Sequence, residues 1–156
     1  MTKTVLFYAH CAADRPHELP TETQIELGTE FIRKQGWKLV EVFTDHMVSG
    51  ATDKTRPGIQ ALRDRTAEGD IDVVLCISMD HLSCDMAHSL EIHSEFRNRG
   101  VEVWTMAGDA PVTDLGLSIR ALLGREIEQQ SRYRARLLAV DDIHSVSVAQ
   151  FPTATQ

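Results

Sequence analysis

The sequence lacks long apolar runs, and positive charge is scarce in it. No apolar stretch approaches the roughly 20 residues that a helix needs to cross a bilayer, so no membrane-spanning segment is expected. Lys and Arg number 16 against 23 Asp and Glu, which gives a net charge of -7. Because affinity for DNA comes largely from Lys and Arg that neutralise phosphates, this balance predicts weak or absent DNA binding.

Cysteines and glycine-rich loops are also few. Cys11, Cys76 and Cys84 are an odd number without the spacing of a disulfide framework, which favours a reduced, cytoplasmic protein. The N-terminus has no secretory signal pattern. Neither a Gly-x-Gly-x-x-Gly segment nor a Gly-Lys-Ser/Thr loop follows the first apolar run, so nothing in the sequence indicates nucleotide binding or any other cofactor.

The chain does contain a regular alternation of apolar runs and amphipathic stretches. The apolar runs cover 4–9, 37–44, 71–79 and 101–106, and the helical patterns between them cover about 21–34, 56–69 and 85–99. This alternation predicts a three-layer α/β domain with a mainly parallel sheet and a long C-terminal helix over 113–138. We expect one domain over residues 1–140 and a disordered tail over 141–156.

Three short segments carry the most specific pattern in the chain. They are Tyr8-Ala9-His10-Cys11-Ala12, Arg56-Pro57-Gly58 and Asp80-His81-Leu82-Ser83-Cys84-Asp85. In order and spacing they resemble signature segments of the serine recombinases, the resolvase and invertase family, over roughly residues 5–138. The resemblance implies a resolvase-like fold and a relation to site-specific DNA recombination, in which DNA strands are exchanged.

The same resemblance implies that catalytic residues have been replaced. The family's nucleophile is a serine that attacks a DNA phosphate, and its position here is Ala12. Three positions of phosphate-holding arginines are His10, His81 and Cys84. Alanine cannot form an ester, and neither imidazole nor thiol offers the planar fork of donors of a guanidinium. We therefore expect a pseudoenzyme, since losing a nucleophile alone lowers a rate by about a millionfold.

Other positions keep the residue type of the family. Arg56 matches a phosphate-binding arginine, Asp80 matches an acidic active-site residue, and Gln24, Ser49 and Ser83 match supporting residues. Cys11 lies beside the lost nucleophile, but neighbours on a strand point to opposite faces. We expect Cys11 to face the core and not to replace the serine.

The predicted helix over 113–138 resembles the family's dimerisation helix. It has an apolar stripe at helical spacing that comprises Leu115, Ile119, Leu122, Leu123 and Ile127. The resemblance implies a homodimer through this helix, and an active recombinase is a second partner to consider. The stripe could instead pack on its own domain, and that alternative stays open here.

We thus expect an inactive serine-recombinase-like domain that acts through oligomerisation. One alternative is a DNA-binding recombinase remnant with residual activity. Another is a metal- or anion-binding module in the former active-site pocket, since His10, His81 and Cys84 are side chains of the kinds that bind zinc. No closely spaced ligand pair supports a zinc site. His88 and His93 are expected to face solvent.

Overall fold

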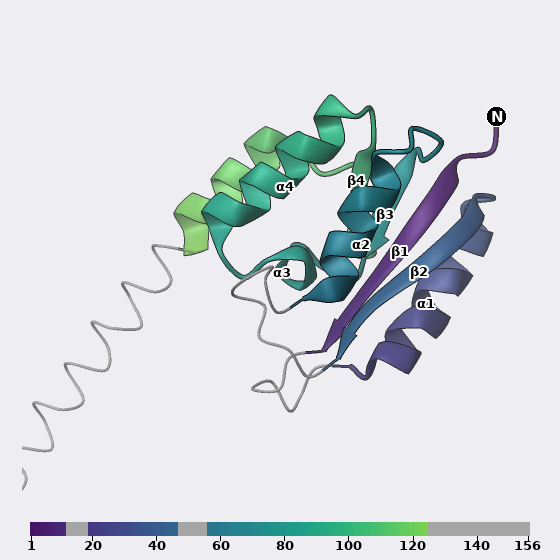
Figure 1. Ribbon diagram of the computed structural model, residues 1–156. Helices are drawn as coiled ribbons and strands as arrows, with labels where there is room; N and C mark the ends of the chain where they lie inside the picture. Colours follow the sequence, from purple (N-terminus) through teal and green to yellow (C-terminus); the bar gives the residue numbers. More distant parts are fainter. Residues whose placement is uncertain (12–18, 47–55, 125–156) are drawn as a thin grey trace, which may run out of the picture. The chain divides into compact units, whose positions relative to one another are not determined.

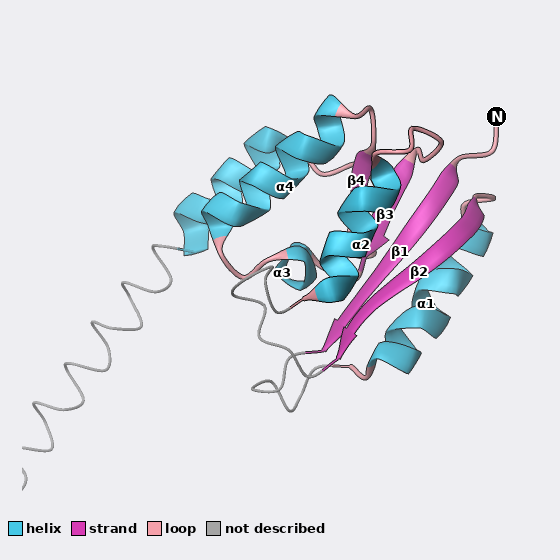
Figure 2. Ribbon diagram, in the orientation of Figure 1, coloured by secondary structure: helices cyan, strands magenta, loops and turns pink. Residues whose placement is uncertain are grey.

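The computed structural model describes residues 1–11, 19–46 and 56–124. Its sheet contains β1 (Thr4–Cys11), β2 (Lys38–His46), β3 (Val73–Cys76) and β4 (Glu102–Thr105). The strand order is β2-β1-β3-β4, and all three neighbouring pairs are parallel (Figure 2). This arrangement confirms the predicted α/β class with a parallel sheet.

Helices cover both faces of this sheet. They are α1 (Thr21–Lys34), α2 (Pro57–Thr66), the short α3 (Met79–Leu82) and α4 (Met86–Asn98). In Figure 1, α1 lies on one face of the sheet, and α2, α3 and α4 lie on the other. The predicted three layers are therefore present.

The last helix begins at residue 114 and is described as far as residue 124. The chain divides into two compact units, Met1–Leu117 and Ser118–Gln156, and the sheet with its four named helices belongs to the first. The predicted continuation to residue 138 and the predicted tail over 141–156 lie outside the described residues. Among those described, no helix has the length and apolar character needed to cross a membrane.

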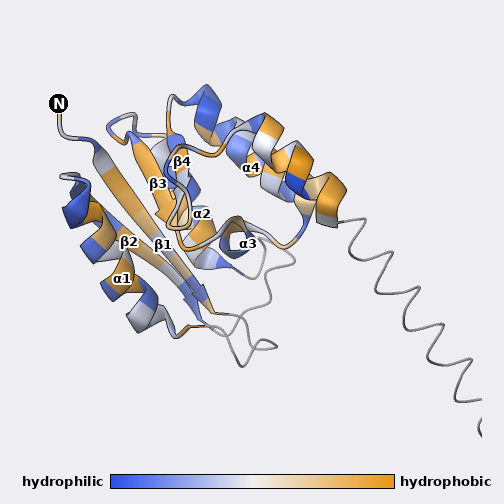
Figure 3. Cartoon of the chain, turned by 180° about the vertical axis from the view of Figure 1, so that it is seen from behind, coloured by the Kyte–Doolittle hydropathy of each residue, from blue (hydrophilic) through white to orange (hydrophobic). Residues whose placement is uncertain are grey.

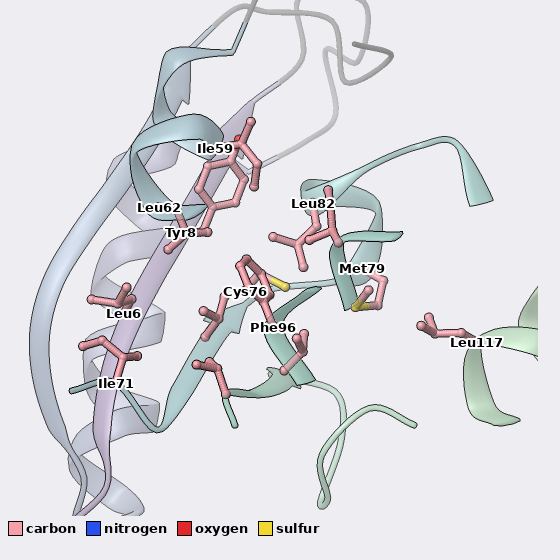
Figure 4. Packing of buried hydrophobic residues seen from close by; sticks show 14 residues of the cluster. Leu6, Tyr8, Ile59, Leu62, Ile71, Cys76, Met79, Leu82, Phe96 and Leu117 are labelled. Atoms are coloured by element: carbon pink, nitrogen blue, oxygen red, sulfur yellow. The ribbon is translucent and has the colours of Figure 1, made fainter. Parts of the chain in front are cut away.

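Two apolar clusters fill the space between sheet and helices, because side chains alternate along the buried central strand β1. Leu6 and Tyr8 point into the larger cluster, together with residues of α2, α3 and α4 (Figure 4). Val5, Phe7 and Ala9 point the other way and meet Ile32 of α1. Apolar residues accordingly dominate the central strands in Figure 3.

The third predicted strand is shorter than expected. The apolar run over 71–79 suggested one strand, but β3 ends at Cys76 and Met79 begins α3. Met79 and Leu82 are buried in the larger cluster from this helical turn. A continuous apolar run therefore contains two elements. The strand β3 buries Val74 and Cys76 in the larger cluster and Val73 and Leu75 in the other, whereas α3 buries its apolar side chains in the larger cluster alone.

Candidate active-site region

Two of the replaced arginine positions meet at the carboxyl end of the sheet. His10 lies near the end of β1, and His81 lies on α3, just after β3. Both side chains are buried, and their ring centroids are 6.2 Å apart in an edge-to-face arrangement. The two residues therefore lie close together, as expected for one former active-site pocket, and their rings contact each other inside the protein.

Cys84 differs from the two histidines in its exposure. It follows α3, it is exposed, and its thiol lies 3.6 Å from the Asp80 carbonyl oxygen. Across the described ranges, no group of three His, Cys, Asp or Glu side chains is placed to hold a metal ion. The suggested zinc ligands His10, His81 and Cys84 therefore do not form a ligand set there.

Two predicted site residues, Ala12 and Ser49, lie outside the described residues. Cys11 is the last residue of β1 and is only partly buried. Its Cα pairs with that of His46 on β2. Cys11 therefore faces the core only in part, because it lies at the carboxyl end of β1, where the strand leaves the sheet.

Arg56 lies at the centre of a buried polar network. Its side chain has 0% exposure. One terminal nitrogen, Nη1, donates to the Leu82 carbonyl oxygen at 2.7 Å, and Nη2 donates to the Tyr8 hydroxyl at 2.5 Å and to the His81 carbonyl oxygen. The Nε atom lies 3.9 Å from Asp45 Oδ2. The guanidinium thus ties α3 to β1 and to the end of β2.

Asp45 connects the same network to the start of α2. Its Oδ1 accepts the backbone N–H of Gly58 at 2.8 Å, and its Oδ2 accepts that of Ile59 at 2.9 Å. A β-carbon at Gly58 would overlap the Thr44 carbonyl oxygen, so only glycine fits this approach of helix to strand. The close approach of α2 to β2 therefore explains the glycine of the Arg56-Pro57-Gly58 segment.

The Tyr8 hydroxyl joins the two charged groups, since it donates to Asp45 Oδ2 at 2.7 Å and accepts from Arg56. Burial raises the pKa of Tyr8 far above its ordinary range. The Arg56 charge opposes this shift, and the hydrogen bond to Asp45 adds to it. Tyr8 is therefore a neutral donor at physiological pH and cannot act as a phenolate nucleophile. Tyr8 and Asp45 were not among the predicted site residues; polar residues within apolar strands are the signal that could have found them.

Gln24 and Ser83, which were expected to support the site, act on the backbone. The buried Gln24 side chain accepts from His10 N–H at 3.2 Å and donates to the His10 and Leu19 carbonyl oxygens at 2.8 and 2.6 Å. Ser83 Oγ accepts the Asp85 N–H at 3.1 Å. Both residues fix the chain at the end of a strand or helix, beside the positions that the arginines would occupy.

The arrangement has a clear chemical consequence. The guanidinium of Arg56 is enclosed and is engaged by protein oxygens, and the imidazoles of His10 and His81 are buried against each other. These three groups are therefore turned toward the protein and not toward solvent. The predicted role of Arg56 in holding a phosphate, and that of Asp80 as an active-site acid, stay predictions.

The sheet order and the elements around its carboxyl end define a resolvase-type α/β domain. The family model "Resolvase, N terminal domain" matches residues 6–138. The chain therefore belongs to this family, the N-terminal domains of serine recombinases.

Individual relatives agree with this assignment. The R46 site-specific recombinase of Escherichia coli is 29% identical over 83 residues, which cover 53% of this chain and 42% of the relative. The transposon Tn3 resolvase of Escherichia coli is 26% identical over 113 residues, 72% of this chain and 59% of the resolvase. The chain thus spans about half the length of these relatives.

A solved structure shows the same fold. The N-terminal catalytic domain of TP901-1 integrase superposes with a TM-score of 0.66 at 23% identity, covering 81% of this chain and 99% of that domain. At this level of identity the likeness concerns the fold.

Proposed function

We propose that this serine-recombinase-like domain, related to site-specific DNA recombination, does not cleave DNA and acts by assembling with another copy of itself or with an active recombinase. The observation that carries the loss of cleavage is the burial of His10 against His81, where the family has arginines. Together with Ala12 at the nucleophile position, this pair supports the proposal, because neither a serine hydroxyl at position 12 nor an exposed cation at positions 10 and 81 is available to serve phosphoryl transfer.

The last helix supports the assembly part of the proposal. Its apolar side chains at residues 115, 119, 122 and 123 form what we call the helix surface. Leu115 is 69% exposed, Ile119 48%, Leu122 64% and Leu123 54%. Four large apolar side chains exposed at helical spacing are typical of a protein-contact surface.

The assembly proposal is tested by the molecular mass of the protein in solution, measured by sedimentation equilibrium over a range of concentrations. The wild type is expected to give a dimer, and the double variant Leu115→Asp, Leu122→Asp is expected to give a monomer, because two charges would have to be buried in the contact. Gly124→Asp, an exposed change that helical spacing places on the opposite side of the same helix from Leu115, is the matched control and should remain dimeric. A wild type that is monomeric at all concentrations would contradict self-assembly.

The same samples separate the proposal from its two alternatives. Retention on duplex DNA that weakens steeply with salt would favour a DNA-binding remnant. About one equivalent of zinc in purified protein, lost on His81→Ala, would favour a metal-binding module. Neither is expected, because the net charge is -7 and the described residues form no three-residue ligand set.

A further inference from the structure

Two tryptophans and a glutamate surround the side chain of Lys3 beside the amino end of the sheet. Trp37 lies directly before β2, and Trp104 and Glu102 lie on β4. The two indole rings meet edge to face, with centroids 5.0 Å apart and an interplanar angle of 79°. The Lys3 ammonium lies 5.7 Å from the centroid of Trp37 and 5.6 Å from that of Trp104. The rings thus form adjoining walls around one ammonium group, and we call Trp37, Trp104 and Glu102 the aromatic cage.

Glu102 supplies the negative charge of the aromatic cage. Its Oε2 accepts hydrogen bonds from the Lys3 ammonium at 2.6 Å and from Trp104 Nε1–H at 2.7 Å. Burial raises the pKa of this carboxyl, but the hydrogen bonds from Lys3 and Trp104 outweigh burial and leave the pKa below its ordinary value. A cation over the face of a tryptophan is attracted by the electrons of the ring. Two such faces and an ionised carboxylate are therefore a set of groups suited to an organic cation.

Contacts other than those of Lys3 hold the walls of the aromatic cage. Trp104 is 9% exposed and belongs to the apolar cluster on the α1 side of the sheet. Its bond to Glu102 needs no ammonium group. The ring of Trp37 contacts that of Phe31 on α1, with centroids 6.2 Å apart. The two walls should therefore keep their places when the Lys3 ammonium leaves.

The Lys3 side chain can leave the aromatic cage while its backbone stays in place. The Lys3 carbonyl oxygen accepts from Lys38 N–H at 2.9 Å, and the next residue, Thr4, bonds to Asp72 through its N–H and its hydroxyl. The side chains of Lys3 and Glu102 are 36% and 39% exposed, so solvent reaches their ion pair. An exposed ion pair contributes little stability, and a released lysine side chain regains rotamer freedom. Lys3 is therefore an occupant that another cation can replace.

We propose that the aromatic cage is a binding site for a quaternary ammonium ligand, and that Lys3 competes with this ligand from within the chain. Taking a charge out of water is costly, and the charge of a quaternary ammonium is spread over a larger apolar group than that of Lys3. Such a group therefore enters between aromatic faces more readily than a primary ammonium. Lys3 has the advantage of a short tether, which gives it a high effective concentration. The site is independent of the proposed function, because neither the active-site region nor the helix surface contributes a residue to it.

The test is a titration of the full chain with choline at constant ionic strength, followed by tryptophan fluorescence. The chain contains two tryptophans, and both are walls of the aromatic cage, so the emission comes from this site. In Lys3→Ala the emission should change in a saturable way, with a midpoint at least about tenfold lower than in the wild type. Lys34→Ala removes an exposed lysine that pairs with Glu30 on α1, and this matched control should respond as the wild type does. The uncharged analogue of choline, in which carbon replaces the nitrogen, should leave the emission unchanged.

The wild type provides a second readout that does not depend on the stability of any variant. The indole rings shift the NMR signals of the Lys3 methylene groups, so at high choline these signals should move toward those of the exposed Lys34, with the midpoint of the fluorescence change. Adding Glu102→Gln to Lys3→Ala should raise the choline midpoint, because the amide carries no charge. Lys3 signals that ignore choline, equal midpoints in the wild type and Lys3→Ala, or an equal response to the uncharged analogue would overturn the proposal.

Discussion

The enclosed network around Arg56 and the replaced positions around His10 lie side by side at one end of the sheet, yet they differ in what they hold. Arg56, Asp45 and Gln24 each bond backbone groups of neighbouring elements. The side chains of His10 and His81 contact each other, and Cys84 is exposed. Arg56 and Gln24, which keep the residue types that the resemblance predicts, thus hold neighbouring elements of the fold together. His10, His81 and Cys84 stand where the resemblance predicts phosphate-binding arginines.

If the Arg56 network holds the fold together, the largest loss of stability should follow substitution of Arg56. In Arg56→Met, the Asp45 carboxylate and the carbonyl oxygens of His81 and Leu82 lose a buried charged partner, so the free energy of unfolding should fall by about 3–5 kcal/mol. Urea unfolding measures the loss. Arg33→Met removes an exposed arginine that pairs with Glu30, and it should leave the urea midpoint unchanged. Equal losses in the two variants would contradict the structural role of Arg56.

A smaller loss is expected where α2 approaches β2. In Gly58→Ala, the added methyl group would meet backbone atoms of Thr44, which cannot move aside as a flexible side chain could. The free energy of unfolding should therefore fall by about 1–3 kcal/mol. Gly124→Ala, in open space on the last helix, is the control, and alanine's higher helix propensity should leave that variant at least as stable as the wild type. Thermal unfolding distinguishes the two outcomes.

Substitutions at His81 and Cys84 should lower the stability less than substitutions in the network around Arg56. His81→Ala removes a ring contact but leaves the His81 carbonyl oxygen that Arg56 uses, so we expect a loss of about 1 kcal/mol. Cys84→Ser, at an exposed position, should have no measurable effect on the urea midpoint. A loss at His81 as large as that of Arg56→Met would remove the distinction between the two regions.

The last prediction concerns the pH dependence of stability, and it involves Asp72 at the opposite end of the sheet. The Thr4 N–H and hydroxyl donate to Asp72 Oδ2 at 2.7 and 2.8 Å, and these bonds, the backbone bond first, lower the pKa of Asp72. A lowered carboxyl pKa adds stability above the pKa of the unfolded chain, and that stability is lost as pH falls through the folded value. Asp72→Asn should therefore narrow the difference in urea midpoint between about pH 7 and about pH 3. An unchanged difference would show that Asp72 does not contribute.

The alternation of apolar runs predicted the parallel sheet because buried strands and amphipathic helices have different periods. It did not predict the break between β3 and α3, since a buried strand and a buried helical turn are both apolar. The resemblance predicted that Arg56 and Gln24 belong to one site; in the structure Arg56 bonds the Leu82 carbonyl oxygen and Gln24 bonds that of His10, and their roles in a site stay predictions. Their bonds to backbone oxygens could not be predicted, because those oxygens come from segments distant in sequence. The expectation that His93 faces solvent was wrong, since its side chain is 4% exposed. Its partners Val112 and Asp114 lie in the loop before the last helix and at the first residue of that helix, and no periodicity in the sequence places them against α4.

The most direct test of the central claim, that this end of the sheet no longer holds a phosphate, is an NMR titration with inorganic phosphate and then with a short DNA duplex. The signals to follow are the ring signals of His10 and His81 and the guanidinium signals of Arg56. Because the two rings are buried against each other and Arg56 is engaged by protein oxygens, none of these signals should shift in a saturable way. A saturable shift at Arg56 together with either histidine would contradict the account.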